Sequence, residues 1–145
     1  MAEIKILEFD PDHIDLALAL WKSCEGIGLS AADEPSRIRG YLSRNPGISF
    51  TAWQGANLVG AVLCGHDGRR GFLHHLAVHP EYRRRGIGKL LVERCHGALH
   101  QEGIDKVHIF VYAKNLKALE FWKAQNYIPR DELVLLSANI PGIEN

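Results

Sequence analysis

The residues with the clearest chemical potential lie in one segment, from Leu73 to Lys89. A predicted strand ends at His79-Pro80, a basic loop follows with Arg83–Arg85, and Gly86 and Gly88 open a predicted helix. The first N–H groups of a helix lack intrahelical partners and carry partial positive charge. Glycines let a phosphate approach those N–H groups closely, and guanidinium groups match phosphate oxygens. The segment therefore predicts a site for a phosphorylated group, in particular a pyrophosphate.

The same spacing also fits a tight turn between a strand and a helix that binds nothing. Two common phosphate motifs do not match. The Walker A pattern needs Ser or Thr after its lysine, but Leu90 follows Lys89. The dinucleotide pattern GxGxxG needs a third glycine where Leu91 stands. On the residues alone, a phosphate site and a tight turn both stay open.

The charges of the 145-residue chain cancel overall, with 17 basic and 17 acidic residues, but they are unevenly distributed. Residues 1–34 have a balance of −6, and residues 69–94 have a balance of +5. Overall neutrality argues against a general nucleic-acid binder. The hydrophobic share of 46% and charged share of 23% are typical of a soluble globular protein.

Other features of the composition indicate the compartment. Three widely spaced cysteines without a CxxC pattern fit a reducing environment and argue against a disulfide framework or zinc ribbon. The acidic start lacks the apolar stretch of a secretory signal, and no apolar run is long enough to cross a membrane. We therefore expect a cytoplasmic protein that does not enter a membrane.

Hydrophobic periodicity predicts the elements that position the central segment. Strands are expected near residues 3–8, 48–53, 58–64, 72–78, 107–111, 127–128 and 133–136. Helices are expected near 12–24, from a cap at Asp33 or Ser36 to Arg44, at 87–103 and at 115–124. Strands alternate with helices only in part, so the pattern predicts a mixed sheet in an α/β architecture. No repeat or linker divides the chain, which predicts a single domain over residues 1–145.

The sequence around this segment resembles the GNAT superfamily of N-acetyltransferases. It is similar to the small, single-domain, bacterial-type members of that superfamily. The family signature Arg/Gln-x-x-Gly-x-Gly/Ala is matched by Arg83, Gly86 and Gly88, after the characteristic run Leu76–Pro80. A second element, Asn-x-x-Ala-x-x-Phe-Tyr-x-x-x-Gly-Phe, is similar to Asn115–Tyr127. The resemblance implies a GNAT-like, mixed and mostly antiparallel central sheet. It also implies splayed parallel central strands, with helices on both faces.

The resemblance further implies acetyl-CoA as co-substrate and no metal. The backbone around Arg84–Lys89 would cradle the pyrophosphate, and the strand edge at Leu76–Val78 would pair with the pantetheine amides if its neighbour splays away. Asn115 would hold the cofactor from the other side of that gap, although a helix N-cap is an equally good use of this residue. The expected cofactor-binding residues are Leu76, Ala77, Val78, Arg83, Arg84, Arg85, Gly86, Ile87, Gly88, Lys89 and Asn115.

Acetyl transfer needs a neutral amine, a donor to the developing oxyanion and a proton for the departing thiolate. A backbone N–H near Leu76 or Ala77 is the family-like oxyanion donor. His74 stands where some members of the family place a catalytic histidine, and a packed strand histidine is the alternative. Strand alternation would turn His75 to the opposite face, with Leu73 and Ala77.

The usual acid of the family is missing. Many members carry a tyrosine where this chain has Trp122, and an indole N–H does not titrate usefully. Water or Tyr112 could supply the proton instead. Tyr127 aligns with the last aromatic residue of the motif, and Asn126 replaces a glycine, which is tolerable because asparagine adopts left-handed backbone conformations.

The leading hypothesis is an N-acetyltransferase that moves an acetyl group from acetyl-CoA to a primary amine by direct transfer in a ternary complex. The acidic residues Glu25, Asp33 and Glu34 are suited to attract a small-molecule or peptide amine. A non-catalytic acyl-CoA-binding or sensor module is the alternative, because of Trp122. A salt-sensitive nucleic-acid binder is a third and poorer fit. A homodimer is left open, and His96 and His100 at i, i+4 spacing are expected to be surface residues rather than metal ligands.

Overall fold

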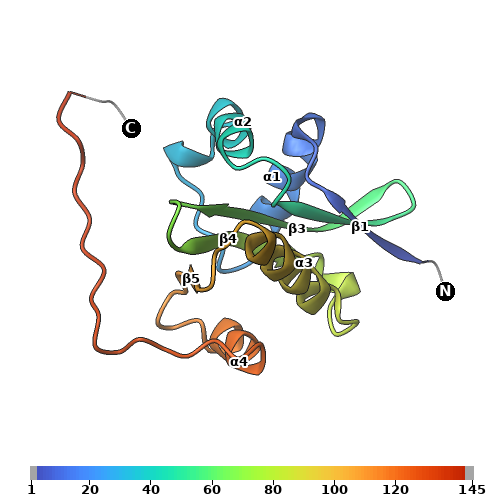
Figure 1. The fold of residues 1–145 in the computed structure, drawn as a ribbon. Coiled ribbons are helices and arrows are strands. Elements are labelled where there is room, and N and C mark those ends of the chain that lie inside the picture. Colours follow the sequence, from blue (N-terminus) through green and yellow to red (C-terminus); the bar gives the residue numbers. More distant parts are fainter. Residues whose placement is uncertain (1–2, 143–145) are drawn as a thin grey trace. The chain divides into compact units, whose positions relative to one another are not determined.

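The computed structural model describes residues 3–142, which divide into two compact units on either side of the Phe110–Val111 bond. The first unit holds a sheet with helices packed on it (Figure 1). Its elements are β1 (Ile4–Glu8), η1 (Pro11–His13), α1 (Ile14–Ser23), η2 (Ala31–Asp33), α2 (Pro35–Arg44), β2 (Phe50–Gln54), β3 (Asn57–His66), β4 (Gly71–Val78), η3 (Pro80–Tyr82), α3 (Ile87–Gln101) and β5 (Val107–Ile109), where η marks a 3₁₀ helix.

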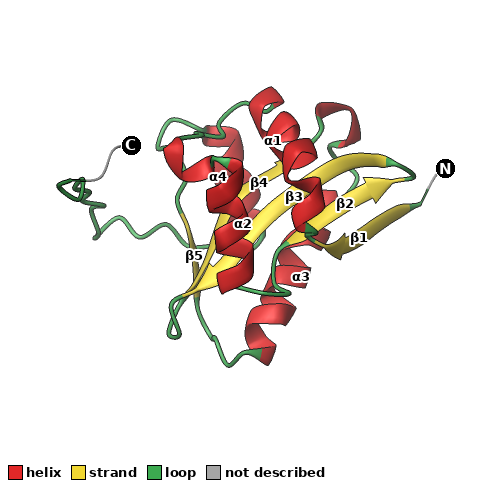
Figure 2. Ribbon diagram, turned by 90° about the horizontal axis from the view of Figure 1, so that it is seen from above, coloured by secondary structure: helices red, strands yellow, loops and turns green. Residues whose placement is uncertain are grey.

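The five strands form one sheet in the order β1-β2-β3-β4-β5 (Figure 2). The first four strands pair antiparallel with their neighbours, and β5 pairs parallel with β4 after the crossover through α3. The strands expected near 48–53 and 58–64 correspond to β2 and β3, which form an antiparallel hairpin. The prediction of a mixed, mostly antiparallel sheet is confirmed.

The parallel pair β4–β5 is short and then splays. Its register runs only from Gly71 opposite Val107 to Leu73 opposite Ile109, whereas β4 continues to Val78. The pairing with β3 persists along this second half of β4, as far as Gly60 opposite Val78. The backbone edge of β4 that faces away from β3 is therefore outside the β5 ladder from His74 onward, as the fold prediction required.

Helices cover both faces of this sheet, with α1 and α2 on one side and α3 on the other (Figures 1 and 2). The inner face that the apolar spacing predicts for α3 is confirmed at Ile87, Leu91, Cys95 and Leu99, which are buried, and is wrong at Leu90, which is 43% exposed. On the opposite side, Trp21 of α1 is fully buried in a cluster that includes residues from α2, β3 and β4. Burial of these apolar surfaces supplies the main driving force for folding of the unit.

One extra residue in β4 changes the direction of its side chains. Ala61 lies opposite Ala77 and Leu63 opposite His74, so a two-residue step on β3 faces a three-residue step on β4. His75 adopts the left-handed conformation, with φ 55°. This is a β-bulge. The expectation that His74 and His75 face opposite sides is wrong, because the bulge brings both side chains to the face covered by α1 and α2.

The second unit contains α4 (Leu116–Ala124). Asn115 is its N-cap and accepts a hydrogen bond from the N–H of Ala118 at 3.1 Å. Asn126 has φ 68°, so the left-handed conformation expected of it is present. Trp122 packs edge-on against Phe121 and Tyr127.

The strands predicted at 127–128 and 133–136 are wrong, because residues 111–142 of the described chain contain no strand. A run of β-prone residues becomes a strand only where another backbone completes its hydrogen bonds. The apolar side chains of Leu133–Leu136 are at least 61% exposed. Within the described residues, no helix has the length and apolar character needed to cross a membrane.

Candidate active site

The loop between β4 and α3 is shaped by two left-handed residues, Arg84 at φ 64° and Gly86 at φ 79°. Gly86 is the N-cap of α3 and has no side chain with which to cap it. The first backbone bond into the helix runs from the N–H of Leu90 to the carbonyl of Gly86 at 3.0 Å. Among the described residues, none accepts a hydrogen bond from the N–H groups of 87–89. These donors, at the positive end of a fifteen-residue helix, are suited to hold an anion.

The arginines of this loop have different local roles. The Nε of Arg83 donates to the carbonyl of Val78 at 2.9 Å, which holds the loop against the end of β4. The guanidinium of Arg85 lies 5.0 Å from the ring centre of Tyr82 and donates to the carbonyl of Glu81. Arg84 is exposed and makes no such contact with any described residue, so its charge is the most available of the three.

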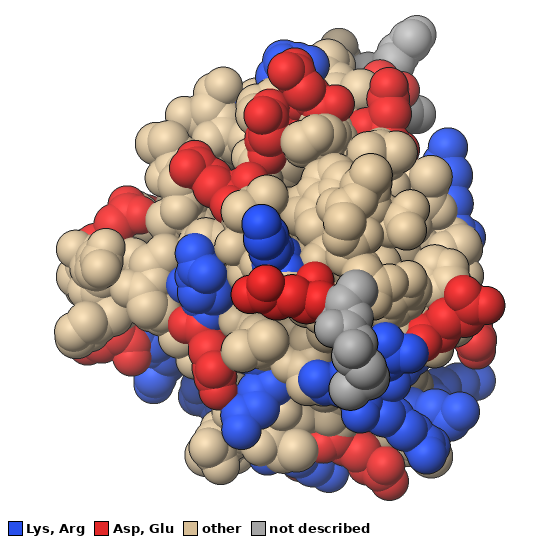
Figure 3. Space-filling model, turned by 90° about the vertical axis from the view of Figure 1, so that its right-hand side faces the viewer, with Lys and Arg blue, Asp and Glu red and all other residues tan. Residues whose placement is uncertain are grey.

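The uneven charge of the sequence is visible on the surface. In Figure 3, Lys and Arg side chains gather over the lower part of the face, on the side of α3, and acidic side chains gather toward the top. Acidic side chains also lie among the basic ones there, and the segment 69–94, with its balance of +5, includes the start of α3. Such a positive balance favours the approach of an anionic ligand.

The two histidines of β4 have different environments. The ring of His74 packs against Tyr41 of α2 at 6.0 Å and against Phe110 at 6.3 Å. Burial, and secondly the nearby His75, lower the pKa of His74 below its ordinary value. Burial likewise raises the pKa of Tyr41 far above its ordinary value. This part of the face is therefore low in dielectric and disfavours charge on His74.

His75, by contrast, has a carboxylate partner. Its Nε2 lies 2.8 Å from Oδ1 of Asp33, and its ring packs on the buried Trp21 with centres 5.2 Å apart. The side chains of His75 and Asp33 are only 17% and 12% exposed. Sequence reasoning treated Asp33 as a helix cap or a surface acid, but α2 begins with Pro35 after Glu34, which makes no side-chain cap bond. No local pattern signals a contact between residues 42 positions apart.

The sequence-predicted residues of the second unit have local partners. Asn115 uses its side-chain oxygen as the cap of α4, which is the alternative role predicted for that residue. Trp122 is buried at 6% exposure, and Tyr112 is 62% exposed.

A shallow hollow of about 460 Å³ lies between α1, the β2–β3 turn and η3. It is lined by His79, Glu81 and Tyr82 at the start of the basic loop, but by neither His74 nor His75. The hollow therefore contains neither of the two histidines of β4 that are candidates for the base. Within residues 3–142, no cluster of three or more His, Cys, Asp or Glu is arranged to hold a metal ion.

A short parallel pair, a bulged β4 and an uncapped glycine-led helix define a class of α/β protein whose first unit is suited to an anionic, extended ligand. Residues 14–127 match the Acetyltransferase (GNAT) family model. The chain belongs to this family and is an acyl-CoA-dependent acetyltransferase.

Individual relatives agree with that identification. An acetyltransferase of Yersinia pseudotuberculosis is 31% identical over 133 residues, covering 92% of each chain. Among solved structures, AAC(6')-Iy in complex with the bisubstrate analogue CoA-S-monomethyl-acetylneamine superposes with a TM-score of 0.77 at 15% identity, covering 96% of this chain and 100% of that one. The PaiA N-acetyltransferase of Thermoplasma acidophilum, in complex with coenzyme A, gives 0.73 at 17% identity, covering 85% and 88%. Both structures show the same fold.

Proposed function

We propose that the protein transfers an acetyl group from acetyl-CoA to a primary amine, directly and within a ternary complex. The observation that carries the proposal is the combination, in one unit, of the free edge of β4 with the uncapped start of α3. An extended ligand with amide groups at one end and phosphates at the other matches this arrangement. The two parts of the chain, residues 1–145, would act together as one acetyltransferase domain.

The proposed cofactor site follows from these donors. The backbone of Leu76–Val78 pairs with the pantetheine arm, and the N–H groups of Ile87, Gly88 and Lys89 hold the pyrophosphate. Charge comes chiefly from Arg84, while Arg83 and Arg85 keep the loop in shape and add to the positive charge. Asn115 is proposed as a further cofactor contact, in addition to its observed role as a helix cap.

The chemistry requires few groups. A base takes a proton from the ammonium form of the acceptor, and the neutral amine attacks the thioester carbon. A backbone N–H at Leu76 or Ala77 stabilises the oxyanion that forms. The C–S bond then breaks, and the thiolate receives a proton from water, from Tyr112 or from the nitrogen that has become an amide. His74 and His75 are the two candidates for the base.

The acceptor is proposed to be a small-molecule or peptide amine. The bisubstrate analogue bound to AAC(6')-Iy links CoA to acetylneamine, which supports an amine acceptor for a protein of this fold. Asp33 is engaged by His75 in this chain, so Glu25 and Glu34, which are exposed, are the acidic residues that remain to attract a cation. Because Trp122 occupies the position of the usual tyrosine acid, the proposal assigns the proton for the thiolate to water, to Tyr112 or to the acceptor nitrogen.

The test compares one substitution at two glycines of the same helix. Gly88→Glu places a carboxylate at the proposed pyrophosphate site and should weaken acetyl-CoA binding about 100-fold or more by calorimetry. Gly97→Glu is the matched control, because Gly97 is exposed and a Cβ there meets nothing within 4 Å. Gly86 is less suitable, since its positive φ would strain any replacement.

Two results would contradict the proposal. Equal acetyl-CoA affinity in the Gly88 and Gly97 variants would remove the pyrophosphate site. Tight acetyl-CoA binding by the wild type, without CoA release on any amine of a broad panel, would favour the non-catalytic module.

A further inference from the structure

The bulge in β4 strains the backbone at His75, whose φ is positive. A non-glycine residue in the left-handed region is strained, and such strain persists only where the surroundings impose it. His75 is held in this conformation while its ring lies between Trp21 and Asp33. A regular strand would place only one of His74 and His75 on the side of α1 and α2, whereas the bulge places both there. The strained residue is thus the one whose imidazole meets a carboxylate.

Asp33 is itself fixed before it meets His75. It closes a capping box in η2, in which its Oδ2 accepts the N–H of Ser30 at 2.9 Å and Ser30 caps the turn in return. Its other oxygen, Oδ1, is the one that contacts His75. Both oxygens therefore have partners, and the carboxylate cannot turn freely. A rigid carboxylate gives the imidazole a defined orientation.

The pairing also decides which nitrogen of His75 carries the proton. A carboxylate only accepts, so the neutral imidazole donates from Nε2 and keeps its lone pair on Nδ1. In the part of the chain that the structure describes, nothing hydrogen-bonds to Nδ1 of His75. His66 differs, because its Nε2 meets Glu102 at 2.9 Å while its Nδ1 accepts the N–H of Gly68 at 3.0 Å. His66 has no nitrogen left for chemistry, whereas His75 has one.

We propose that His75, through Nδ1, is the base that deprotonates the acceptor amine, and that Asp33 is its positioning residue. The inference rests on the proposed function and refines it, since His74 would otherwise be the first choice. His74 has no carboxylate partner among the described residues, and its environment disfavours a charge on it.

The proposed step conserves atoms and charge. Nδ1 of His75 takes one proton from the ammonium acceptor, and the freed nitrogen lone pair forms the C–N bond to the acetyl carbon. The C–S bond breaks, and its electron pair stays on the sulfur of CoA. The second proton of the nitrogen goes to this thiolate, directly or through water. The imidazolium of His75, stabilised by Asp33, releases its proton to solvent, so the products are an amide, CoA and one proton.

Among the residues that the structure describes, few titratable groups lie near His75. Asp33 comes from η2, His74 from the same strand, and Tyr41 from α2 through its contact with His74. The side chain that α1 places against His75 is Trp21, which carries no charge. If a substitution of His75 changes the pH–rate profile, the change can therefore be assigned to His75 or to these neighbours.

The first measurement does not depend on turnover. Nitrogen-15 NMR of the imidazoles should show neutral His75 protonated at Nε2, and Asp33→Asn should move a substantial part of that proton to Nδ1, because the carboxamide can donate to Nε2. Glu102→Gln is the control and should leave the His75 signals unchanged. A wild-type His75 protonated at Nδ1 would overturn the proposal, whatever the activity.

The second measurement is the pH–rate profile. His75→Asn, chosen because asparagine tolerates the left-handed backbone, should lower kcat about 100-fold and abolish the acidic limb, with acetyl-CoA affinity unchanged within twofold. His75→Gly, which also fits this backbone, should regain activity with added imidazole. His66→Asn should keep wild-type kcat. His74→Gln should keep the acidic limb even if kcat falls.

The outcomes distinguish the role of His75 from the proposed function. Suppose that the wild type is active. If the pH–rate profile of His75→Asn keeps its acidic limb, or that of His74→Gln loses it, the role of His75 is overturned and the acetyltransferase function stands. A wild type that binds acetyl-CoA but acetylates no amine refutes the proposed function, and the NMR result alone then decides whether the pair exists as described.

Discussion

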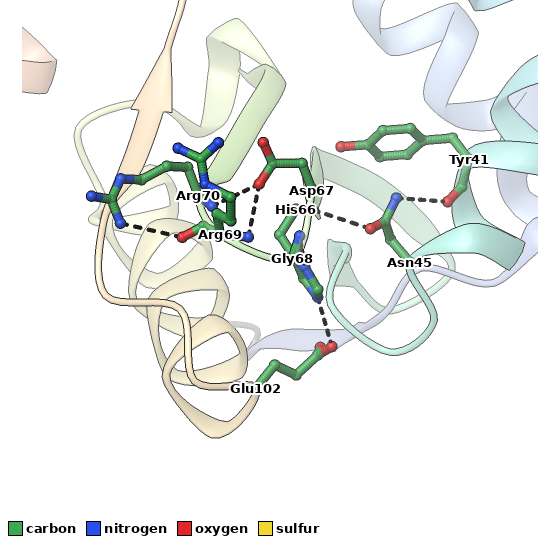
Figure 4. Close-up of polar contacts among 8 residues, drawn as sticks. All are labelled: Tyr41, Asn45, His66, Asp67, Gly68, Arg69, Arg70 and Glu102. Atoms are coloured by element: carbon green, nitrogen blue, oxygen red, sulfur yellow. Dashed lines mark hydrogen bonds and ion pairs between the residues drawn. The ribbon is translucent and has the colours of Figure 1, made fainter.

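Two histidine–carboxylate pairs in the first unit look alike by distance and differ in almost every other respect. His75 and Asp33 are 2.8 Å apart, and His66 and Glu102 are 2.9 Å apart. The first pair is mostly buried and is made by a bulged, left-handed residue, while the second lies at the more exposed end of β3. In Figure 4, polar contacts connect His66 with Asn45, Gly68 and Glu102, and the neighbouring Asp67 accepts from the backbone of Arg69 and Arg70.

The two pairs differ in the second ring nitrogen, which makes a structural hydrogen bond in His66 and which our proposal assigns to proton transfer in His75. Both ring nitrogens of His66 have partners, and its backbone N–H donates to the side-chain oxygen of Asn45 at 3.1 Å. The fold gains a well-defined loop between β3 and β4 from these bonds. His75 is instead held in a strained conformation, and none of residues 3–142 hydrogen-bonds to its Nδ1. Strain with an unused lone pair is the arrangement expected of a functional group.

The largest stability effect that tests this contrast concerns the backbone. At position 75, valine should be about 1–2 kcal/mol less stable than glycine, because a β-branched residue fits poorly at φ 55°. At position 66, where the backbone is an ordinary strand, the valine variant should instead be about 0.5–1 kcal/mol more stable than the glycine variant. Urea unfolding of the four variants measures both differences. Valine that is as stable as glycine at position 75 would show that the bulge is absent.

The titration of His74 should respond to the first pair and not to the second. The pKa of His74 is lowered by burial and then by His75, and Asp33 partly opposes this. We therefore expect Asp33→Asn to lower the pKa of His74 further, and His75→Asn to raise it. Because the lowered pKa means that the unfolded chain binds this proton more readily, the contribution of His74 to stability is present above pH 6.5 and declines as the pH falls.

Proton NMR of the His74 ring across the range from mildly acidic to neutral pH measures these shifts. Glu102→Gln is the control and should leave the pKa of His74 in place. A response of His74 to Glu102 that equals its response to Asp33 would mean that the two pairs are not electrostatically separate.

Much of the fold could be predicted because local sequence patterns determine it. The apolar spacing of Ile87, Leu91, Cys95 and Leu99 defines a helix face without reference to the rest of the chain. The glycine and arginine spacing from Arg83 to Gly88 likewise places a strand-to-helix loop. The predictions of strand positions were correct where a partner strand exists, and wrong at 133–136, where the described chain supplies none.

The proposed catalytic pair could not be predicted, because no part of it is local. The bulge depends on a mismatch of one residue between β3 and β4, which only the register reveals. Alternation within β4 therefore wrongly placed His74 and His75 on opposite faces. The choice of Asp33 as partner depends on a capping box in η2, formed 42 residues earlier in the chain. The role of His74 as base, expected from the sequence, stays a prediction that the pH profile tests.

The smallest expected effect lies in the turn that follows His66. Oδ1 of Asp67 accepts the N–H groups of Arg69 and Arg70 at 2.8 Å each, and the bonds from Arg70 and then Arg69 hold the pKa of Asp67 below its ordinary value (Figure 4). A lowered pKa means that the contribution of Asp67 to stability is present above the unfolded pKa of about 3.9 and is lost as the pH falls through the folded value. Hydrogen exchange at the amides of Arg69 and Arg70 should therefore lose protection in acid. The same loss should occur at neutral pH in Asp67→Ala, with kcat unchanged, because this turn contributes order and no proton acceptor. A fall in kcat with Asp67→Ala would show that the turn and the His75 pair are coupled, and the separation drawn between the two regions would then be wrong.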